Sequence, residues 1–382
     1  MKTNHKIIYR DARKMGELPN ESIDLVVTSP PYPMIEMWDE AFAGLNNKIG
    51  KALKSGSGPL AFELMNKELD KVWDEVYRVL KKGGIACINI GDATRTINSR
   101  FALYTNHSRI QHYAQKIGFS ALPAILWRKQ TNAPNKFMGS GMMPPGAYVT
   151  LEHEYVLVLR KGNRREFKTE REKKLRRESA FFWEERNNWF SDVWMDLKGT
   201  RQSLFDRKAR ERSAAFPFEL PYRLISMFSI KEDTVMDPFL GIGTTMFAAM
   251  AAGRNSIGCE IDKNFQDTIV SKLPGIVDFS NARISRRLEN HFDFIEARCK
   301  RRGEFKYANS RYRFPVTTRQ EKDLLINEVK YVNRVGQNSF EATYSDEPQA
   351  DYVGYWEGHV ASAPEKPETP AKPRKRKSTH KQ

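Results

Sequence analysis

The sequence contains few of the residues that build metal sites and disulfide frameworks. Its three cysteines, Cys87, Cys259 and Cys299, are widely spaced and form no CxxC pair. The seven histidines are scattered, and His153 lies between two glutamates instead of in an HExxH motif. Zinc sites need clustered Cys and His ligands. We therefore expect no bound metal and a reducing compartment.

Long apolar runs are missing as well. No stretch has the length of apolar sequence that crosses a bilayer, and residues 1–11 lack the apolar core of a secretory signal. The chain has neither the GxxxxGK(S/T) loop that cradles phosphates nor the GxGxxG loop of dinucleotide-binding folds. These absences argue against a membrane-spanning helix, P-loop chemistry and a dinucleotide cofactor.

Acidic residues are outnumbered, with 47 Asp and Glu against 63 Lys and Arg and a net charge of +16. Such a balance predicts a polyanionic partner, although charge alone does not separate nucleic acid from an anionic membrane. Residues 160–177 are densely basic, and aromatic residues cluster at 181–194. A charge run usually forms a solvated helix face. Here basic residues, which can neutralise phosphates, precede aromatic residues, which can stack on bases, and this combination favours DNA contact. The predicted DNA-binding residues are Arg164, Arg165, Lys168, Arg171, Lys173, Lys174, Arg176 and Arg177.

Apolar segments alternate between strand-like and helix-like spacing. We expect strands at 6–9, 23–28, 85–90, 121–127, 154–159, 234–237 and 256–260, and helices at 69–80, 108–117, 246–252 and 281–302. Residues 33–60 mix Met, aromatic, Gly and Ser residues and are expected to form a loop-rich cover. This alternation predicts an α/β fold whose parallel or mixed sheet is covered on both faces.

The apolar run 23–27 ends in Thr28-Ser29-Pro30-Pro31-Tyr32. Two consecutive prolines fix φ and remove two amide donors, so the strand cannot continue as a paired ladder. The result is a stiff corner with one hydroxyl, free carbonyls and one aromatic ring. Such a corner can hold a flat ring that bears an amino group, although these five residues alone also fit a surface turn.

A second loop, residues 237–245 (DPFLGIGTT), joins a compact strand to a helix of small residues. Gly241 and Gly243 let the backbone approach a ligand closely, and the free amides at the helix start face the same crevice. Glu260 ends the next strand, where ribose hydroxyls lie in nucleoside-binding α/β folds. The loop followed by this acid indicates a nucleoside-containing cofactor.

Together, TSPPY at 28–32, DPFLGIGTT at 237–245 and GCEID at 258–262 resemble the amino-group DNA methyltransferases that use S-adenosylmethionine. The likeness spans residues 5–270. Because the corner precedes the glycine loop, the order resembles the β-type, circularly permuted group. The resemblance implies an α/β, Rossmann-like sheet of seven strands, with an inserted target-recognition region and a basic, disordered C-terminal tail.

The resemblance divides the chain into parts. Residues 1–129 are the catalytic half, 130–213 the target-recognition region and 214–302 the cofactor-binding half. Residues 303–362 form an extension of unknown role, which could be a small extra domain. Residues 363–382 form a Pro/Lys/Arg-rich tail, whose prolines at a spacing of three suit an extended arm that adds affinity for nucleic acid. A solubilising tail is the alternative.

Roles follow from the matching motifs. Ser29 and the Pro30 carbonyl are expected to accept hydrogen bonds from the target amino group, Pro31 to hold the geometry and Tyr32 to stack on a flipped base. The cofactor's methionine end is expected at Asp237 and the loop glycines Gly241 and Gly243, its adenine near Phe239 and its ribose at Glu260. The other residues expected to form the cofactor pocket are Asp11, Thr28, Phe216, Pro217, Pro238, Thr244 and Thr245.

Serine at the first corner position resembles the N4-cytosine enzymes, whereas aspartate is more typical of N6-adenine enzymes. No cysteine follows a proline, which argues against carbon-5 methylation. We therefore expect a site-specific cytosine-N4 methyltransferase of a restriction-modification or an epigenetic system, acting on double-stranded DNA in the cytoplasm at the nucleoid. A restriction endonuclease that acts on the same site is a candidate partner. The alternatives are an N6-adenine enzyme, a DNA-binding relative without turnover, and an RNA or protein methyltransferase, which the motif order disfavours.

Overall fold

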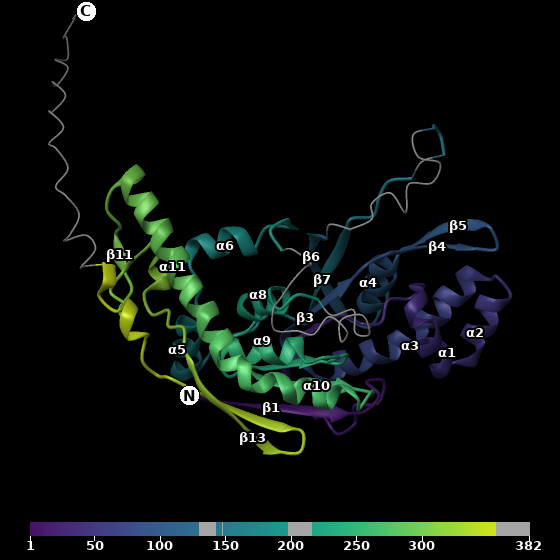
Figure 1. Ribbon diagram of the computed structural model, residues 1–382, viewed down its shortest axis with the longest axis horizontal. Coiled ribbons are helices and arrows are strands. Elements are labelled where there is room, and N and C mark those ends of the chain that lie inside the picture. The colour runs from purple at the N-terminus through teal and green to yellow at the C-terminus, as the bar shows by residue number, and fades with distance from the viewer. Residues whose placement is uncertain (130–142, 147, 198–215, 357–382) are drawn as a thin grey trace, which may run out of the picture.

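The computed structural model describes residues 1–129, 143–146, 148–197 and 216–356 (Figure 1). The strands are β1 (Lys2–Tyr9), β2 (Ile23–Thr28), β3 (Leu80–Ile90), β4 (Ala93–Ile97), β5 (Arg100–Tyr104), β6 (Phe119–Arg128), β7 (His153–Lys161), β8 (Val193–Trp194), β9 (Thr234–Asp237), β10 (Asn255–Glu260), β11 (Tyr307–Ala308), β12 (Pro315–Val316), β13 (Val329–Gly336) and β14 (Ser339–Tyr344). The α-helices are α1 (Asp39–Leu45), α2 (Asn47–Lys54), α3 (Gly58–Val79), α4 (Asn106–Lys116), α5 (Glu170–Glu178), α6 (Trp183–Trp189), α8 (Glu219–Phe228), α9 (Thr244–Ala252), α10 (Phe265–Lys272) and α11 (Ile276–Arg302). The seven predicted strands are confirmed as β1, β2, β3, β6, β7, β9 and β10, with longer bounds in several cases.

The main sheet has ten strands in the described residues, in the order β13-β14-β1-β10-β9-β2-β3-β7-β6-β8. The expected number of seven is therefore too low. The run from β1 to β3 is parallel, whereas β7 is antiparallel to both β3 and β6. The additional strands are β8, at one edge, and the hairpin β13–β14, at the other.

The sheet is covered on both faces, as the sequence predicted. Every residue of β2 is buried, because its alternate side chains enter two different cores. Ile23 and Val26 pack with residues of α3 and α4, while Leu25 and Val27 pack with residues of α8 and α9. A strand apolar on both faces is typical of the centre of an α/β sheet. This burial holds the end of β2 in a fixed place.

The carboxyl ends of β1, β10, β9, β2 and β3 lie at one edge of the sheet, because these five strands run parallel. β9 and β2 are adjacent, so the TSPPY corner and the glycine loop emerge side by side. Ligands of open α/β sheets bind in the crevice outside the carboxyl ends of the strands. The topology thus brings together two loops that lie about 200 residues apart in the sequence. The sequence motifs predict both of them at one crevice.

The cover over this edge is helical, so the loop-rich cover expected at 33–60 is wrong. It comprises a 3-10 turn (Glu36–Trp38), α1, α2 and the first turn of α3, which begins at Gly58 instead of near residue 69. α2 is a short amphipathic helix that buries Ile49 and Ala52. Its Gly and Ser neighbours suggested a loop, but the apolar spacing within it is helical.

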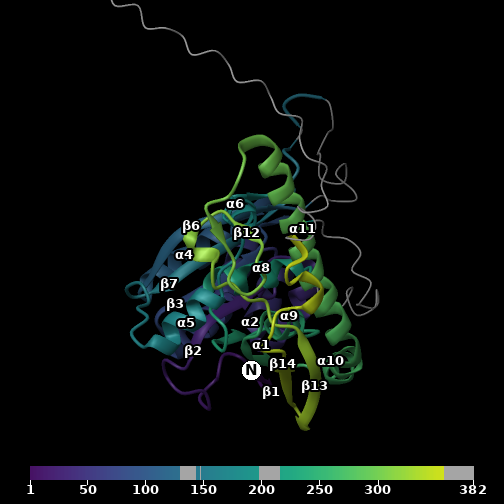
Figure 2. The ribbon, with the colours of Figure 1, turned by 90° about the vertical axis from the view of Figure 1, so that its left-hand side faces the viewer.

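The C-terminal region contributes directly to the main sheet. β14 pairs antiparallel with β1, and β13 pairs with β14, so both lie along the bottom edge in Figure 1. Residues 329–344 therefore do not form a separate domain. Figure 2 shows the hairpin beside the start of β1. None of the described helices is both long and apolar enough to cross a bilayer.

Candidate active site

A pocket of about 940 Å³ opens where the two predicted loops meet. It lies at the carboxyl ends of β2, β9 and β10. Of the predicted catalytic and cofactor residues, its wall contains Asp11, Ser29, Pro30, Pro31, Tyr32, Phe216, Asp237, Pro238, Phe239, Gly241, Thr244 and Glu260. The others, Thr28, Pro217, Gly243 and Thr245, are not part of that wall. Pockets for small ligands commonly measure about 300–1,000 Å³, so this one can hold a nucleoside-containing ligand together with a base.

Asp237 connects the two loops. Its carboxylate accepts hydrogen bonds from Thr28 Oγ1 (2.6 Å), Thr245 Oγ1 (2.6 Å) and the Phe239 amide (3.0 Å). Burial raises the pKa of Asp237 to about 6, and the three hydrogen bonds oppose that rise. Thr28 and Thr245 do not line the pocket, but their hydroxyls hold the Asp237 carboxylate that does.

Glu260 shapes the glycine loop. One of its carboxylate oxygens accepts the Gly241 amide (2.7 Å), and the other accepts the Asp262 amide (2.8 Å). Burial raises its pKa. Gly243 has φ of 85°, a left-handed conformation that favours glycine. A Cβ there would lie 3.2 Å from Phe247 and 3.3 Å from Ile269.

Asp11 lies in the pocket wall as expected, but it is neutralised. Arg13 donates to both of its oxygens and also pairs with Glu68. Burial opposes the effect, yet the hydrogen bonds from Arg13 lower the pKa of Asp11. Asp237 and Glu260 differ from Asp11, because within the described residues neither forms a hydrogen bond or ion pair with a cationic side chain. Asp237 and Glu260 are thus available to a cationic ligand.

Sequence reasoning missed a polar network behind the TSPPY corner. Tyr32 Oη donates to Glu154 Oε2 (2.9 Å) and accepts from Ser29 Oγ (3.1 Å) and Asn89 Nδ2 (2.9 Å). Asn89 also donates to Glu154 Oε2 (2.7 Å), and Lys129 Nζ donates to Glu154 Oε1 (2.7 Å). Burial, followed by the nearby Glu154 carboxylate, raises the pKa of Tyr32 well above its usual value.

The network has a direction that follows from these donors. Because the only O–H of Ser29 donates its hydrogen bond to Tyr32 Oη, the Ser29 oxygen can accept a hydrogen bond from the pocket. Glu154 and Lys129 come from neighbouring antiparallel segments, since Trp127 of β6 pairs with Glu154 of β7. No local sequence signal contains that register, so these two residues could not be found from the sequence alone.

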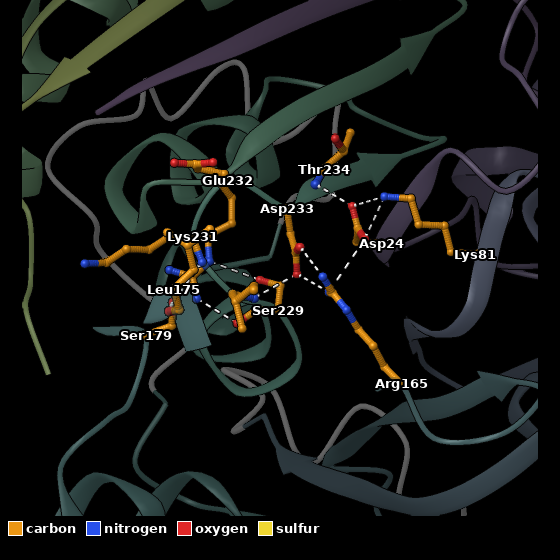
Figure 3. A network of polar contacts seen from close by, with 12 residues as sticks. Asp24, Lys81, Arg165, Leu175, Ser179, Ser229, Lys231, Glu232, Asp233 and Thr234 are labelled. Carbon is orange, nitrogen blue, oxygen red and sulfur yellow. Dashed lines mark hydrogen bonds and ion pairs between the residues drawn. The ribbon is translucent and has the colours of Figure 1, made fainter. Parts of the chain in front are cut away.

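The predicted DNA-binding segment does not reach the pocket. It lies at the amino ends of the strands, where Arg165 Nη1 and Nη2 donate to Asp233 (2.6 and 3.0 Å) and Arg165 approaches Asp24 (3.6 Å), as Figure 3 shows. Carboxylates also neutralise other members of the set, with the pairs Lys168–Glu166, Arg171–Glu232, Lys173–Glu170, Lys174–Glu178 and Arg177–Asp323. Arg176 lies over the ring of Phe167, and Arg164 is exposed next to Arg165. The segment is thus separate from the crevice, and its contact with DNA stays a prediction.

The aromatic cluster that follows is largely structural. Phe182, Trp189 and Trp194 are buried, and the Trp194 indole donates to the Trp189 carbonyl (3.0 Å). They cannot stack on bases without unfolding the core. The rest of the predicted target-recognition region includes 130–142, 147 and 198–213, which lie outside the described residues, as does the predicted tail at 363–382.

Among the described residues, no group of three or more His, Cys, Asp or Glu side chains is arranged to hold a metal. Cys87 and Cys259 are buried core residues. Burial raises the pKa of both thiols, that of Cys259 to about 12. Neither is suited to act as a thiolate nucleophile.

Comparison with known proteins places these features in a family. Residues 23–271 match the family model N6_N4_Mtase, described as DNA methylase. The type II methyltransferase M.MthZI of Methanothermobacter thermautotrophicus is 53% identical over 347 residues, 91% of this chain and 96% of its own. The type II methyltransferase M.MjaI of Methanocaldococcus jannaschii is 54% identical over 71% of this chain and 91% of its own.

Solved structures share the fold. TTHA0409 of Thermus thermophilus, assigned as a DNA modification methylase and solved with S-adenosyl-L-methionine, is 30% identical with a TM-score of 0.56. The match covers 71% of this chain and 95% of that one. The cytosine-N4-specific PvuII DNA methyltransferase is 18% identical with a TM-score of 0.52 over 73% and 92%. At that identity the PvuII structure indicates the fold alone.

Proposed function

The chain belongs to the N4/N6 family of DNA methylases and uses S-adenosylmethionine, and from this premise we propose that it methylates the N4 amino group of cytosine in duplex DNA. The observation that carries the proposal is the neutral Ser29, held as an acceptor beside Pro30 in the pocket of the glycine loop. The order of the two motifs supports the β-type permuted arrangement. The names of its type II relatives support a cognate endonuclease as partner.

The residues of the pocket fit the cofactor. S-adenosylmethionine supplies a methyl group on a cationic sulfonium and also carries a methionine ammonium. Asp237 and Glu260 offer buried carboxylates whose hydrogen-bond donors are all neutral, so their charge is not already cancelled. We assign Asp237 to the ammonium, Glu260 to the ribose, and Phe239 to the adenine.

The TSPPY corner positions the target amino group and forms no covalent intermediate with the base. Ser29 Oγ and the Pro30 carbonyl accept the two amino protons of the target base, which directs the nitrogen lone pair toward the methyl group. Holding two reactants in line in this way removes much of the entropic barrier. The base must leave the duplex to reach the pocket, because the amino group is paired inside the helix.

The identity of the methylated base is the first test. We expect that the protein, incubated with labelled S-adenosylmethionine and duplex DNA that is then digested to nucleosides, places label in N4-methylcytosine. A neutral serine acceptor suffices because it orients the lone pair without removing a proton beforehand. Label in N6-methyladenine would show that the methylated base is adenine, and the protein would still be a DNA methylase. If no nucleoside carried label, the proposal that the protein methylates DNA would be wrong.

Glu154 is proposed as a positioning residue for the corner. Glu154 anchors Tyr32, which accepts the hydrogen bond from Ser29 Oγ. Removing the charge of Glu154 therefore loosens the position of Ser29 without changing a residue assigned to the cofactor. We expect Glu154→Gln to lower kcat about tenfold, in line with the loss of a charge-assisted hydrogen bond. The KM for S-adenosylmethionine and the melting temperature are expected to stay near wild type.

The same strand pair provides a matched control for this prediction. Glu152 pairs with Arg128 as Glu154 pairs with Lys129, but neither Glu152 nor Arg128 lines the pocket. Glu152→Gln should therefore leave kcat unchanged. If the two variants behave alike, or if Glu154→Gln raises only the KM for the cofactor, Glu154 does not position the corner.

A further inference from the structure

α2 has an exposed basic face that lacks partners. Lys48, Lys51 and Lys54 are exposed and spaced by three residues, and their side chains form no hydrogen bond or ion pair within the described part of the chain. The helix contains no acidic residue. Its opposite face buries Ile49 and Ala52, so the three ammonium groups are presented from a fixed support. We call them the α2 lysine face.

The helix that carries this face is joined to the pocket wall through its neighbours. α1, which precedes α2, contributes Ala41, Phe42 and Leu45 to the pocket wall. Asn46, the N-cap of α2, donates to Glu68 Oε1 (3.3 Å), and Glu68 also lines the pocket. Figure 1 shows α1 and α2 at the right-hand end of the molecule, beyond the carboxyl ends of the strands.

The other basic segment, which includes α5, lies at the opposite end. In Figure 1 α5 is on the left, and in Figure 2, where that side faces the viewer, it lies in front. Its cations are largely paired with acids, as Figure 3 shows for Arg165. Inside the pocket, Arg13 and Lys129 are also paired with carboxylates. The α2 lysine face thus combines free charge with nearness to the site.

We propose that the α2 lysine face binds the phosphate backbone of the duplex next to the flipped base. The proposal rests on the proposed function only in taking duplex DNA as substrate. The three lysines span about 9 Å of helix axis at about 1.5 Å per residue, comparable with two or three phosphates at about 3.4 Å of axis each. Such contacts fix the protein on the duplex without reading its sequence.

A salt series tests this with the full-length protein and a labelled duplex of arbitrary sequence. Each phosphate contact contributes a slope of about 0.9 to log K against log salt. The triple variant Lys48→Gln, Lys51→Gln, Lys54→Gln is expected to reduce that slope by roughly 2 to 3, and to weaken binding at least tenfold near about 0.1 M salt. Glutamine keeps the helix propensity, and the side chains form no polar contact in the described chain, so the melting temperature should not change.

The control is a triple variant of equal charge, Lys168→Gln, Lys173→Gln, Lys174→Gln, at the opposite end of the molecule. It should keep the wild-type slope. Equal losses in the two variants, or a loss in the control alone, would overturn the proposal. Binding is measured without methyl transfer, so a wrong base assignment does not affect the outcome. If the wild-type protein methylates DNA but the α2 variant keeps the wild-type salt slope, the proposal for the α2 lysine face is wrong and the proposed function is unaffected.

Discussion

Replacing Ser29 by alanine is expected to lower single-turnover methyl transfer by about 100-fold or more, the effect of removing one preorganised hydrogen bond at a reacting group. Ser29 Oγ donates to Tyr32, so its oxygen is available to the target amino group. Alanine removes that acceptor without creating a steric clash. Cofactor affinity should be unchanged, because the residues that we assign to the cofactor are Asp237, Phe239 and Glu260.

Rapid-quench measurement of labelled methyl groups in DNA, together with calorimetric titration of the cofactor, checks this result. Thr28→Ser serves as the neighbouring control, because it retains the hydroxyl that donates to Asp237. That variant should transfer methyl groups at close to the wild-type rate. Near-normal transfer by Ser29→Ala would show that the amino group is held by other acceptors.

The second large effect concerns Asp237. Because burial raises its pKa to about 6, the carboxyl of the free protein takes up a proton as pH falls through about 6. Only the carboxylate attracts the methionine ammonium, so cofactor affinity should fall on the acidic side by up to about tenfold per pH unit. Asp237→Asn should bind about 10- to 100-fold more weakly near neutral pH, the loss of a charge-assisted hydrogen bond. Its affinity should vary less with pH than that of the wild type, because, of the two carboxylates assigned to the cofactor, only Glu260, whose pKa burial also raises, still titrates.

Isothermal titration between about pH 5 and pH 8, a range that spans the titration of Asp237, measures both features. Asp11→Asn is the informative control, because the pKa of Asp11 is lowered and Asp11 does not titrate in that range. That variant is expected to keep the pH dependence whatever its absolute affinity. A wild-type affinity that stays constant across the series would mean that Asp237 does not meet the ammonium.

Much of the site was accessible from the sequence because its parts are local. The double proline after an apolar run and the two glycines before a small-residue helix are backbone properties of consecutive residues. Each specifies where a strand ends, and parallel strands place their ends at one edge. That is why Ser29, Asp237 and Glu260 were identified in advance and line one pocket.

Side-chain contacts between segments that are distant in the sequence could not be predicted from the sequence. Glu154 reaches Tyr32 through the register of two antiparallel strands, and Arg165 meets Asp233, which lies 68 residues further along the chain. The α2 helix was hidden by the glycines and serines around it. The sequence predicts no strand for the hairpin β13–β14, because β13 is an edge strand with one buried residue in eight and so lacks an apolar alternation.

The sequence by itself determined the cofactor loop, the corner and the family resemblance, since these depend on backbone conformation within a few residues. Only the tertiary structure decided which charges remain free. The dense basic segment is largely neutralised by acids, several of them from other elements, while three lysines on a short helix are not. Net charge is a property of composition, but its availability to DNA depends on which carboxylates the fold brings near.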